Sequence, residues 1–218
     1  MRARLAIAVV AAVSASALAQ DGSRSLRTAN GMLQRGLFDQ AAAEYADALR
    51  ALDEPAARDE ARYGLAVARF NLGQDRRTLD ALGQLESGSR FEFRADADVL
   101  RLHALMRLKD YPRAADAAAT AVRHRDHAAW AGTASLQIEA MTRAGRHAQA
   151  VQAYGNHAER LEQDTNAYRR ASFFAGVSQA AAAQRTADHA RAAEWFARAI
   201  PRRGADALAS LAMLERAN

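Results

Sequence analysis

Residues 36–48 read GLFDQAAAEYADA, and residues 145–157 repeat the same pattern as GRHAQAVQAYGNH. In each copy a glycine is followed five positions later by a small residue, Ala41 or Ala150, and then four positions later by a tyrosine. Glycine adopts the left-handed conformation that ends a helix, and apolar residues three and four apart lie on one helix face. The stretch therefore predicts a turn followed by an amphipathic helix.

The pattern recurs along most of the chain. Further copies open at Lys109 and Ala187, and a weaker one opens at Gly73, with Thr78 and Leu82 at the matching positions. Counted from residue 36, the turn positions 73, 109, 145 and 187 are 37, 36, 36 and 42 residues apart. Periods of this size are typical of helical solenoids. We expect the longest interval to contain an insertion around residues 161–166.

The chain after its first residues has helical periodicity throughout. No alternating strand pattern occurs, and 3 Pro and 12 Gly among 218 residues are too few for an all-β chain rich in turns. We therefore predict an all-α repeat array over residues 22–204, built of about five helical hairpins. A last helix within residues 205–218, with Leu208, Leu211 and Leu214 on one stripe, is expected to cap the array.

These positions resemble the tetratricopeptide repeat (TPR) family. The resemblance is carried by the residues at the turn, at the small positions and at the aromatic position of each copy: Gly36, Ala41, Tyr45, Ala48, Asp110, Tyr111, Ala114, Ala121, Gly145, Ala150, Tyr154, Ala192, Phe196 and Ala199. It implies a right-handed α-solenoid of antiparallel helix hairpins, in which the aromatic residue fills the groove to the next repeat. The period here is slightly longer than the usual value of about 34 residues.

The first nineteen residues, MRARLAIAVVAAVSASALA, are typical of a secretory signal peptide. Arg2 and Arg4 form the positive region, the apolar run from Leu5 to Val13 follows, and Ala17 and Ala19 form the small-residue cleavage motif. Cleavage is expected after Ala19, which predicts a periplasmic or secreted protein. The apolar run is too short to cross a bilayer core of about 30 Å, so no membrane span is expected in the mature chain.

Composition excludes several classes of chemistry. The chain has no Cys, which rules out disulfides, cysteine nucleophiles and thiolate metal sites. The net charge of +5 arises from 30 basic and 25 acidic residues mixed along the chain, so no nucleic-acid partner is expected. His124 and His127 lie beside Arg123 and Arg125, which repel a cation, so no metal site is expected. Nucleotide-binding, hydrolase and metalloprotease motifs are missing as well, and we expect neither an enzyme nor a cofactor.

The remaining candidates for function lie on a surface. In the family that the chain resembles, the first helix of each hairpin lines a concave groove that receives a peptide. Transferring those positions with the turn residue as the register gives a candidate groove of twelve residues: Asn30, Gln34, Tyr63, Val67, Phe70, Asn71, His103, Arg107, Glu139, Arg143, Gln184 and Arg185.

Two features of this groove indicate a ligand. Arg107, Arg143 and Arg185 hold the same place in successive units, and guanidinium groups bind carboxylates with paired hydrogen bonds. The apolar residues of the second repeat, Tyr63, Val67 and Phe70, form a patch beside them. We therefore expect a peptide with acidic and apolar residues. The alternative for the arginines is helix capping, because any cation at a helix C-terminus is stabilised by about 0.3–1 kcal/mol.

Three functions fit these observations. The first is an exported, non-enzymatic scaffold that binds a protein or peptide partner in its groove, in envelope assembly or secretion. The second is a helical accessory domain of a cell-wall-processing system, and the third is a self-assembling module that dimerises through the C-terminal helix. The first is favoured, because the second requires a catalytic carboxylate in a pocket and the sequence offers no candidate.

Overall fold

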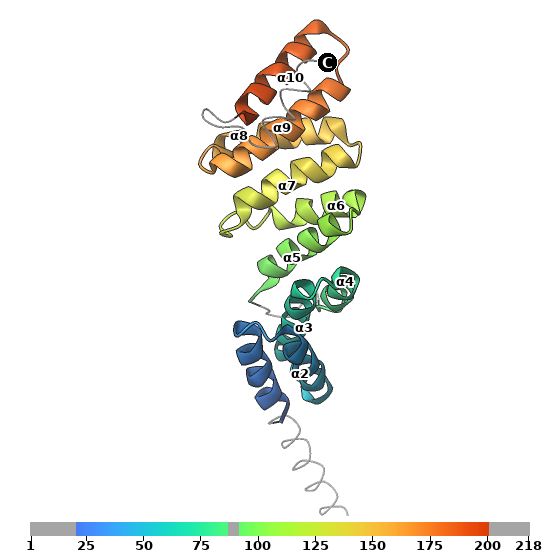
Figure 1. Ribbon diagram of the computed structural model, residues 1–218, viewed down its shortest axis with the longest axis vertical. Helices are drawn as coiled ribbons and strands as arrows, with labels where there is room; N and C mark the ends of the chain where they lie inside the picture. Colours follow the sequence, from blue (N-terminus) through green and yellow to red (C-terminus); the bar gives the residue numbers. More distant parts are fainter. Residues whose placement is uncertain (1–20, 87–91, 201–218) are drawn as a thin grey trace, which may run out of the picture. The chain divides into compact units, whose positions relative to one another are not determined.

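The computed structural model describes residues 21–86 and 92–200, which belong to two compact units, Met1–Ala104 and Leu105–Asn218 (Figure 1). The predicted signal peptide and the predicted terminal helix lie outside the described residues. Every regular element among the described residues is an α-helix, which confirms the predicted all-α fold class.

The first unit begins with a helix over residues 21–34, which packs with α2 (Phe38–Ala51) in one apolar core. The next hairpin consists of α3 (Pro55–Asn71) and the short α4 (Asp75–Gly83). α3 contacts both α2 and α4, so the second hairpin packs against the first. α5 (Arg94–Arg107) begins in the first unit and ends in the second.

The second unit continues with α6 (Tyr111–Ala121), α7 (Trp130–Arg143), α8 (His147–Leu161), α9 (Thr165–Ala181) and α10 (Thr186–Ala199). α7 packs against α6, α8 and α9, and α9 packs in turn against α8 and α10 (Figure 1). Contacts between helices one and two places apart in the chain are those of a solenoid of helical hairpins, as the repeat pattern predicts.

The turns at four predicted positions share one backbone conformation. Gly36, Gly73 and Gly145 have φ of 74°, 75° and 73°, and Lys109 has φ of 58° at the equivalent place. Left-handed backbone is readily adopted by glycine and is unfavourable for a residue with a Cβ. Lys109 adopting it shows that the repeat geometry, and not the residue type alone, sets this turn.

The predicted pattern of small and large residues forms the core. The first small position is almost fully buried in all five copies: Ala41, Thr78, Ala114, Ala150 and Ala192. Four positions later, larger side chains are buried in four of the copies: Tyr45, Leu82, Tyr154 and Phe196. A Cβ added to Gly64 of α3 would lie 2.2 Å from the Tyr45 ring. The bare backbone of Gly64 therefore makes room for the tyrosine between two hairpins, as the resemblance implies.

The predicted insertion around residues 161–166 is wrong. The turn between α8 and α9 spans only residues 162–164, and Asp164 caps α9 by accepting hydrogen bonds from the N–H groups of Asn166 and Ala167. The matching turn at residues 52–54 has the same length, and Glu54 caps α3 in the same way. The extra residues lie between α9 and α10 and in the first turn of α10, so Ala187 lies inside a helix instead of at a turn.

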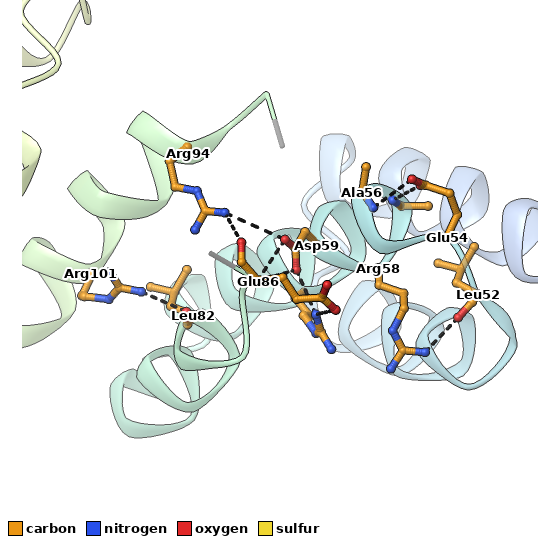
Figure 2. Close-up of polar contacts among 11 residues, drawn as sticks. Leu52, Glu54, Ala56, Arg58, Asp59, Leu82, Glu86, Arg94 and Arg101 are labelled. Carbon is orange, nitrogen blue, oxygen red and sulfur yellow. Dashed lines mark hydrogen bonds and ion pairs between the residues drawn. The ribbon is translucent and has the colours of Figure 1, made fainter. Parts of the chain in front are cut away.

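A buried carboxylate joins α3 to the segment after α4 (Figure 2). The fully buried Asp59 accepts a 2.9 Å hydrogen bond from Arg62, and the backbone N–H of Glu86 donates to both of its oxygens at 3.1 and 3.2 Å. Arg94 lies 4.0 Å from the same carboxylate and donates to the Glu86 carbonyl at 2.5 Å. Asp59 thus fixes the end of the second hairpin, a role that the repeat pattern does not indicate.

Candidate functional site

Asn30, the first of the predicted groove residues, forms hydrogen bonds with side chains of α2 and α3. Its Nδ2 donates to Glu60 at 3.0 Å, and its Oδ1 accepts a 2.6 Å hydrogen bond from the Tyr45 hydroxyl. Burial, with Glu60 nearby, raises the pKa of Tyr45 to about 12, so the hydroxyl stays protonated and donates. Gln34 is exposed at the end of the same helix.

The apolar residues predicted on α3 form a partly exposed stripe. Tyr63, Val67 and Phe70 are all half-buried. The Tyr63 ring stacks on the exposed ring of Phe93, with centroids 5.6 Å apart and 8° between the planes, and burial raises the pKa of Tyr63 to about 12. Asn71, the last residue of α3, donates to the Val67 carbonyl at 2.9 Å, which helps to end the helix.

Two of the three arginines predicted to form a row hold equivalent places in their helices, and Arg185 does not. Arg107 and Arg143 are the last residues of α5 and α7, and both are exposed, as is His103 one turn before Arg107. The place predicted for Arg185 is wrong, because α9 already ends at Ala181. Arg185 is the N-cap of α10, with extended backbone at φ −136° and ψ 155°. A register counted from residue 187 places Gln184 and Arg185 beyond the end of the helix.

A polar cluster in the second compact unit surrounds Glu139 on α7. Its side chain is 5% exposed, and each carboxylate oxygen meets a different arginine. Oε1 accepts a 2.8 Å hydrogen bond from Arg143 Nε, and Oε2 accepts one of 2.7 Å from Arg170 Nε. Arg170 also brings its Nη2 to 2.5 Å from Oε2. Because Arg170 lies on α9, the carboxylate links two consecutive hairpins.

Two aromatic rings flank the Arg143 guanidinium. Its central carbon lies 5.3 Å from the ring centroid of Tyr111, at the start of α6, and 5.3 Å from that of Phe174, on α9. The faces of aromatic rings attract cations. Arg143 is therefore oriented by a carboxylate and by two rings at once.

This Glu139 cluster, consisting of Glu139, Arg143, Arg170, Tyr111 and Phe174, presents fixed cations at the surface. The side chains of Arg143 and Arg170 are 44% and 41% exposed and share one buried carboxylate, so the three charged groups sum to +1. A guanidinium has five N–H donors, and Glu139 takes up only some of them. The cluster is suited to binding a carboxylate through charge-assisted hydrogen bonds.

Sequence reasoning found two members of this cluster as groove residues and missed three. Tyr111 belongs to the repeat pattern at the start of α6, and Arg170 and Phe174 lie at positions of α9 that the groove register does not include. Counted back from Ala181, the true end of α9, the same register gives Ala181 and Val177, so it does not reach Arg170 or Phe174. The signal for that end is weak, because no glycine marks it.

Within the described residues, 21–86 and 92–200, His, Asp and Glu side chains form no group of three or more that is placed to hold a metal ion. None of the helices in these two ranges is both long enough and apolar enough to cross a membrane.

No protein-family model matches the sequence, and a search of curated proteins finds no match. Solved structures do match. The crystal structure of YrrB, described as a TPR protein with an unusual peptide-binding site, has a TM-score of 0.70 at 20% identity and covers 87% of this chain and 90% of its own. PilF of Pseudomonas aeruginosa has a TM-score of 0.59 at 15% identity, with 92% of this chain and 85% of its own covered.

The helices and their contacts define an α-solenoid of helical hairpins. Its fold is that of the tetratricopeptide repeat proteins, so the resemblance seen in the sequence is confirmed for the fold.

Proposed function

We propose that this protein is an exported, non-enzymatic scaffold that binds a protein or peptide partner through the surface formed by the first helices of its hairpins. The TPR fold supports the scaffold role, since TPR neighbours are in general protein-interaction folds without catalytic activity. YrrB, one of these neighbours, is described as having a peptide-binding site.

The single observation that carries the proposal is the Glu139 cluster. Two half-exposed guanidiniums are fixed by one buried carboxylate, and one of them lies between two aromatic rings. Donors that are already oriented bind a carboxylate with little loss of side-chain freedom. The partner is therefore expected to present an acidic residue next to apolar residues, which would contact Tyr111 and Phe174.

The first experiment identifies the partner. Crosslinking in the native cell, followed by mass spectrometry of the captured protein, supplies the sequence from which a binding peptide is made. Its affinity for the full mature protein is then measured by calorimetry.

The second experiment tests the cluster without unfolding it. A triple variant, Glu139→Gln with Arg143→Gln and Arg170→Gln, removes both guanidiniums and leaves no buried carboxylate unpaired. We expect it to bind the captured peptide about tenfold more weakly or worse, since a hydrogen bond to a charged group contributes about 1.5–3 kcal/mol. Arg191→Gln, at an exposed position of α10, is the control and should bind normally. Equal affinity of the triple variant would refute the role of the cluster.

Export is proposed from the first nineteen residues alone. Fractionation of the native cell should find the protein outside the cytoplasm, and N-terminal sequencing of that protein should begin at Gln20. An intact Met1 on the mature protein would contradict cleavage.

A further inference from the structure

A polar pocket lies at the opposite end of the α7–α8 hairpin from Arg143. It has a volume of about 300 Å³ and is lined by Arg125, Trp130, Asn156, His157, Glu159, Arg160 and Gln163. This volume is at the lower end of the range for pockets that hold small ligands. All of its residues belong to the second unit.

The central donor of this pocket is fixed in place. The Arg160 guanidinium lies over the Trp130 ring, 4.2 Å from its centroid, and Nη2 donates to the Arg125 carbonyl at 2.6 Å. The Trp130 indole N–H donates in turn to the Val122 carbonyl at 3.0 Å. A stacked and hydrogen-bonded guanidinium loses little further freedom when it binds a ligand.

The charge of the lining favours an anion. Arg125 and Arg160 are cationic, and Glu159 is the acidic residue among the lining side chains. His157 meets the Trp130 ring edge-on at 5.4 Å, and its Nε2 lies 3.1 Å from Gln137 Oε1. Burial, followed by the nearby Arg125 charge, lowers the pKa of His157, so this imidazole is neutral at pH 7.5. The lining therefore sums to +1.

The remaining lining residues add hydrogen-bonding capacity. Asn156 and Gln163 contribute carboxamide N–H donors beside the two guanidiniums. A planar anion that accepts several hydrogen bonds matches this set better than a cation or an apolar group. Carboxylate is such an anion, and guanidinium is its preferred partner in proteins.

We propose that this pocket binds a carboxylate group of a peptide, held by Arg125 and by the Arg160 guanidinium that Trp130 supports. The carboxylate comes from the C-terminus of the peptide or from an Asp or Glu side chain. The inference deepens the proposed scaffold function by adding a second contact for the partner. The pocket shares no residue with the Glu139 cluster, so either site can fail while the other stands.

The sequence offers a built-in reporter for this pocket. It has two Trp, so Trp195→Phe leaves Trp130 as the single indole fluorophore. The mature protein with this change is titrated with three probes: acetyl-trialanine with a free carboxylate, its C-terminal amide, and acetyl-Ala-Glu-Ala amide. We expect a saturable fluorescence change with at least one carboxylate probe and none with the uncharged amide. The free acid and the Glu peptide separate the two sources.

Variants then assign the binding to the pocket. Arg125→Gln should lower the affinity for the carboxylate probe about fivefold or more, and Glu159→Gln should raise that affinity. Arg191→Gln and the triple glutamine variant of the Glu139 cluster should bind the probe as the parent does. If Trp130 fluorescence does not respond to binding, calorimetry with the same probes still detects it.

Three results would overturn the inference. One is that neither carboxylate probe, up to about 10 mM, produces heat or a fluorescence change. An affinity weaker than this would be too low for a useful contact. Another is equal binding of the uncharged amide, and the third is an unchanged affinity of Arg125→Gln. These probes do not include the natural partner, so such results do not affect the test of the Glu139 cluster. Failure of the Glu139 cluster test likewise does not affect the test of this pocket.

Discussion

At two glycines, an aromatic ring of the neighbouring helix leaves no room for a side chain. A Cβ on Gly64 would lie 2.2 Å from the Tyr45 ring, and one on Gly176 would lie 2.8 Å from the Phe196 ring. Both rings are almost fully buried, so neither has room to move aside. A Cβ on Gly132 or Gly155, by contrast, would meet no atom within 4 Å outside its own helix.

The first prediction concerns these glycines. Gly64→Ala should lower the free energy of unfolding by about 1–3 kcal/mol, because the added methyl group overpacks the Tyr45 site. Gly132→Ala, the matched control within α7, should raise it by up to about 1 kcal/mol, since alanine costs less conformational entropy in a helix. Urea denaturation measures both changes. A neutral Gly64→Ala would mean that Tyr45 does not sit between the hairpins as described.

His157 predicts a pH dependence of stability. Its pKa is lowered in the folded protein by burial and by Arg125, whereas in the unfolded protein it titrates near the usual value of about 6.5. As the pH falls through about 6.5, the unfolded state therefore binds more protons than the folded state does. The free energy of unfolding decreases as a result.

The test compares urea midpoints at pH 7.5 and 5.5. His157→Gln should lose less stability between these two values than the parent protein does. Arg191→Gln changes an exposed residue of α10 that does not titrate in this range, and it should keep the parent's pH dependence. Identical pH dependence in the parent and in His157→Gln would contradict the assignment.

Among the elements, α3 is joined to Glu86, just after α4, by one buried carboxylate. Asp59 is fully buried, and the side chain of its partner Arg62 is only 12% exposed. Removing one member of a buried ion pair leaves the other charge without compensation. The pair of Asp47 and Arg50 has the same i,i+3 spacing on α2, but its side chains are 54% and 73% exposed.

The two pairs give a matched prediction. Asp59→Ala should destabilise the protein by about 3–5 kcal/mol, while Asp47→Ala should cost about 0–1 kcal/mol, because water screens an exposed pair. Thermal and urea denaturation of both variants measure the difference. Similar losses for the two would show that Asp59 is not buried in solution.

Local patterns account for most of the elements. Glycine turns, small residues five positions later and large residues four positions after those are short-range signals, so hairpins at residues 36, 73, 109 and 145 were predictable. The connection between α9 and α10 was not predictable. It lacks the left-handed residue found in the other repeats, and α10 begins one helical turn earlier than its counterparts do.

The candidate site was less predictable than the fold. Glu139 and Arg143 follow from the repeat register, but Arg170 and Phe174 meet them from the next hairpin, about thirty residues further along the sequence. Asp59 was missed for a similar reason, since its binding to the Glu86 N–H depends on how the backbone returns after α4. Contacts between repeats depend on helix lengths, which the pattern fixes only approximately.

For the molecule as a whole, stability is the sum of contacts between neighbouring hairpins. Within each unit, α2 contacts α3 and α3 contacts α4, and the helices from α6 to α10 contact helices one or two places away, so a local defect is expected to have local effects. Native-state hydrogen exchange should show Gly64→Ala raising exchange in α2, α3 and α4 while α8, α9 and α10 keep the protection of the parent protein. Uniformly faster exchange across both groups would indicate a single cooperative unit.

The Glu139 carboxylate also has a mechanical consequence. It accepts hydrogen bonds from α7 and from α9, so the junction of these two hairpins is tied by charge as well as by packed methyl groups. When such a protein is stretched from its ends, the hairpins would detach one at a time, and this junction would resist at a higher force than one held by alanine contacts alone. A partner seated on the two guanidiniums would raise that force again.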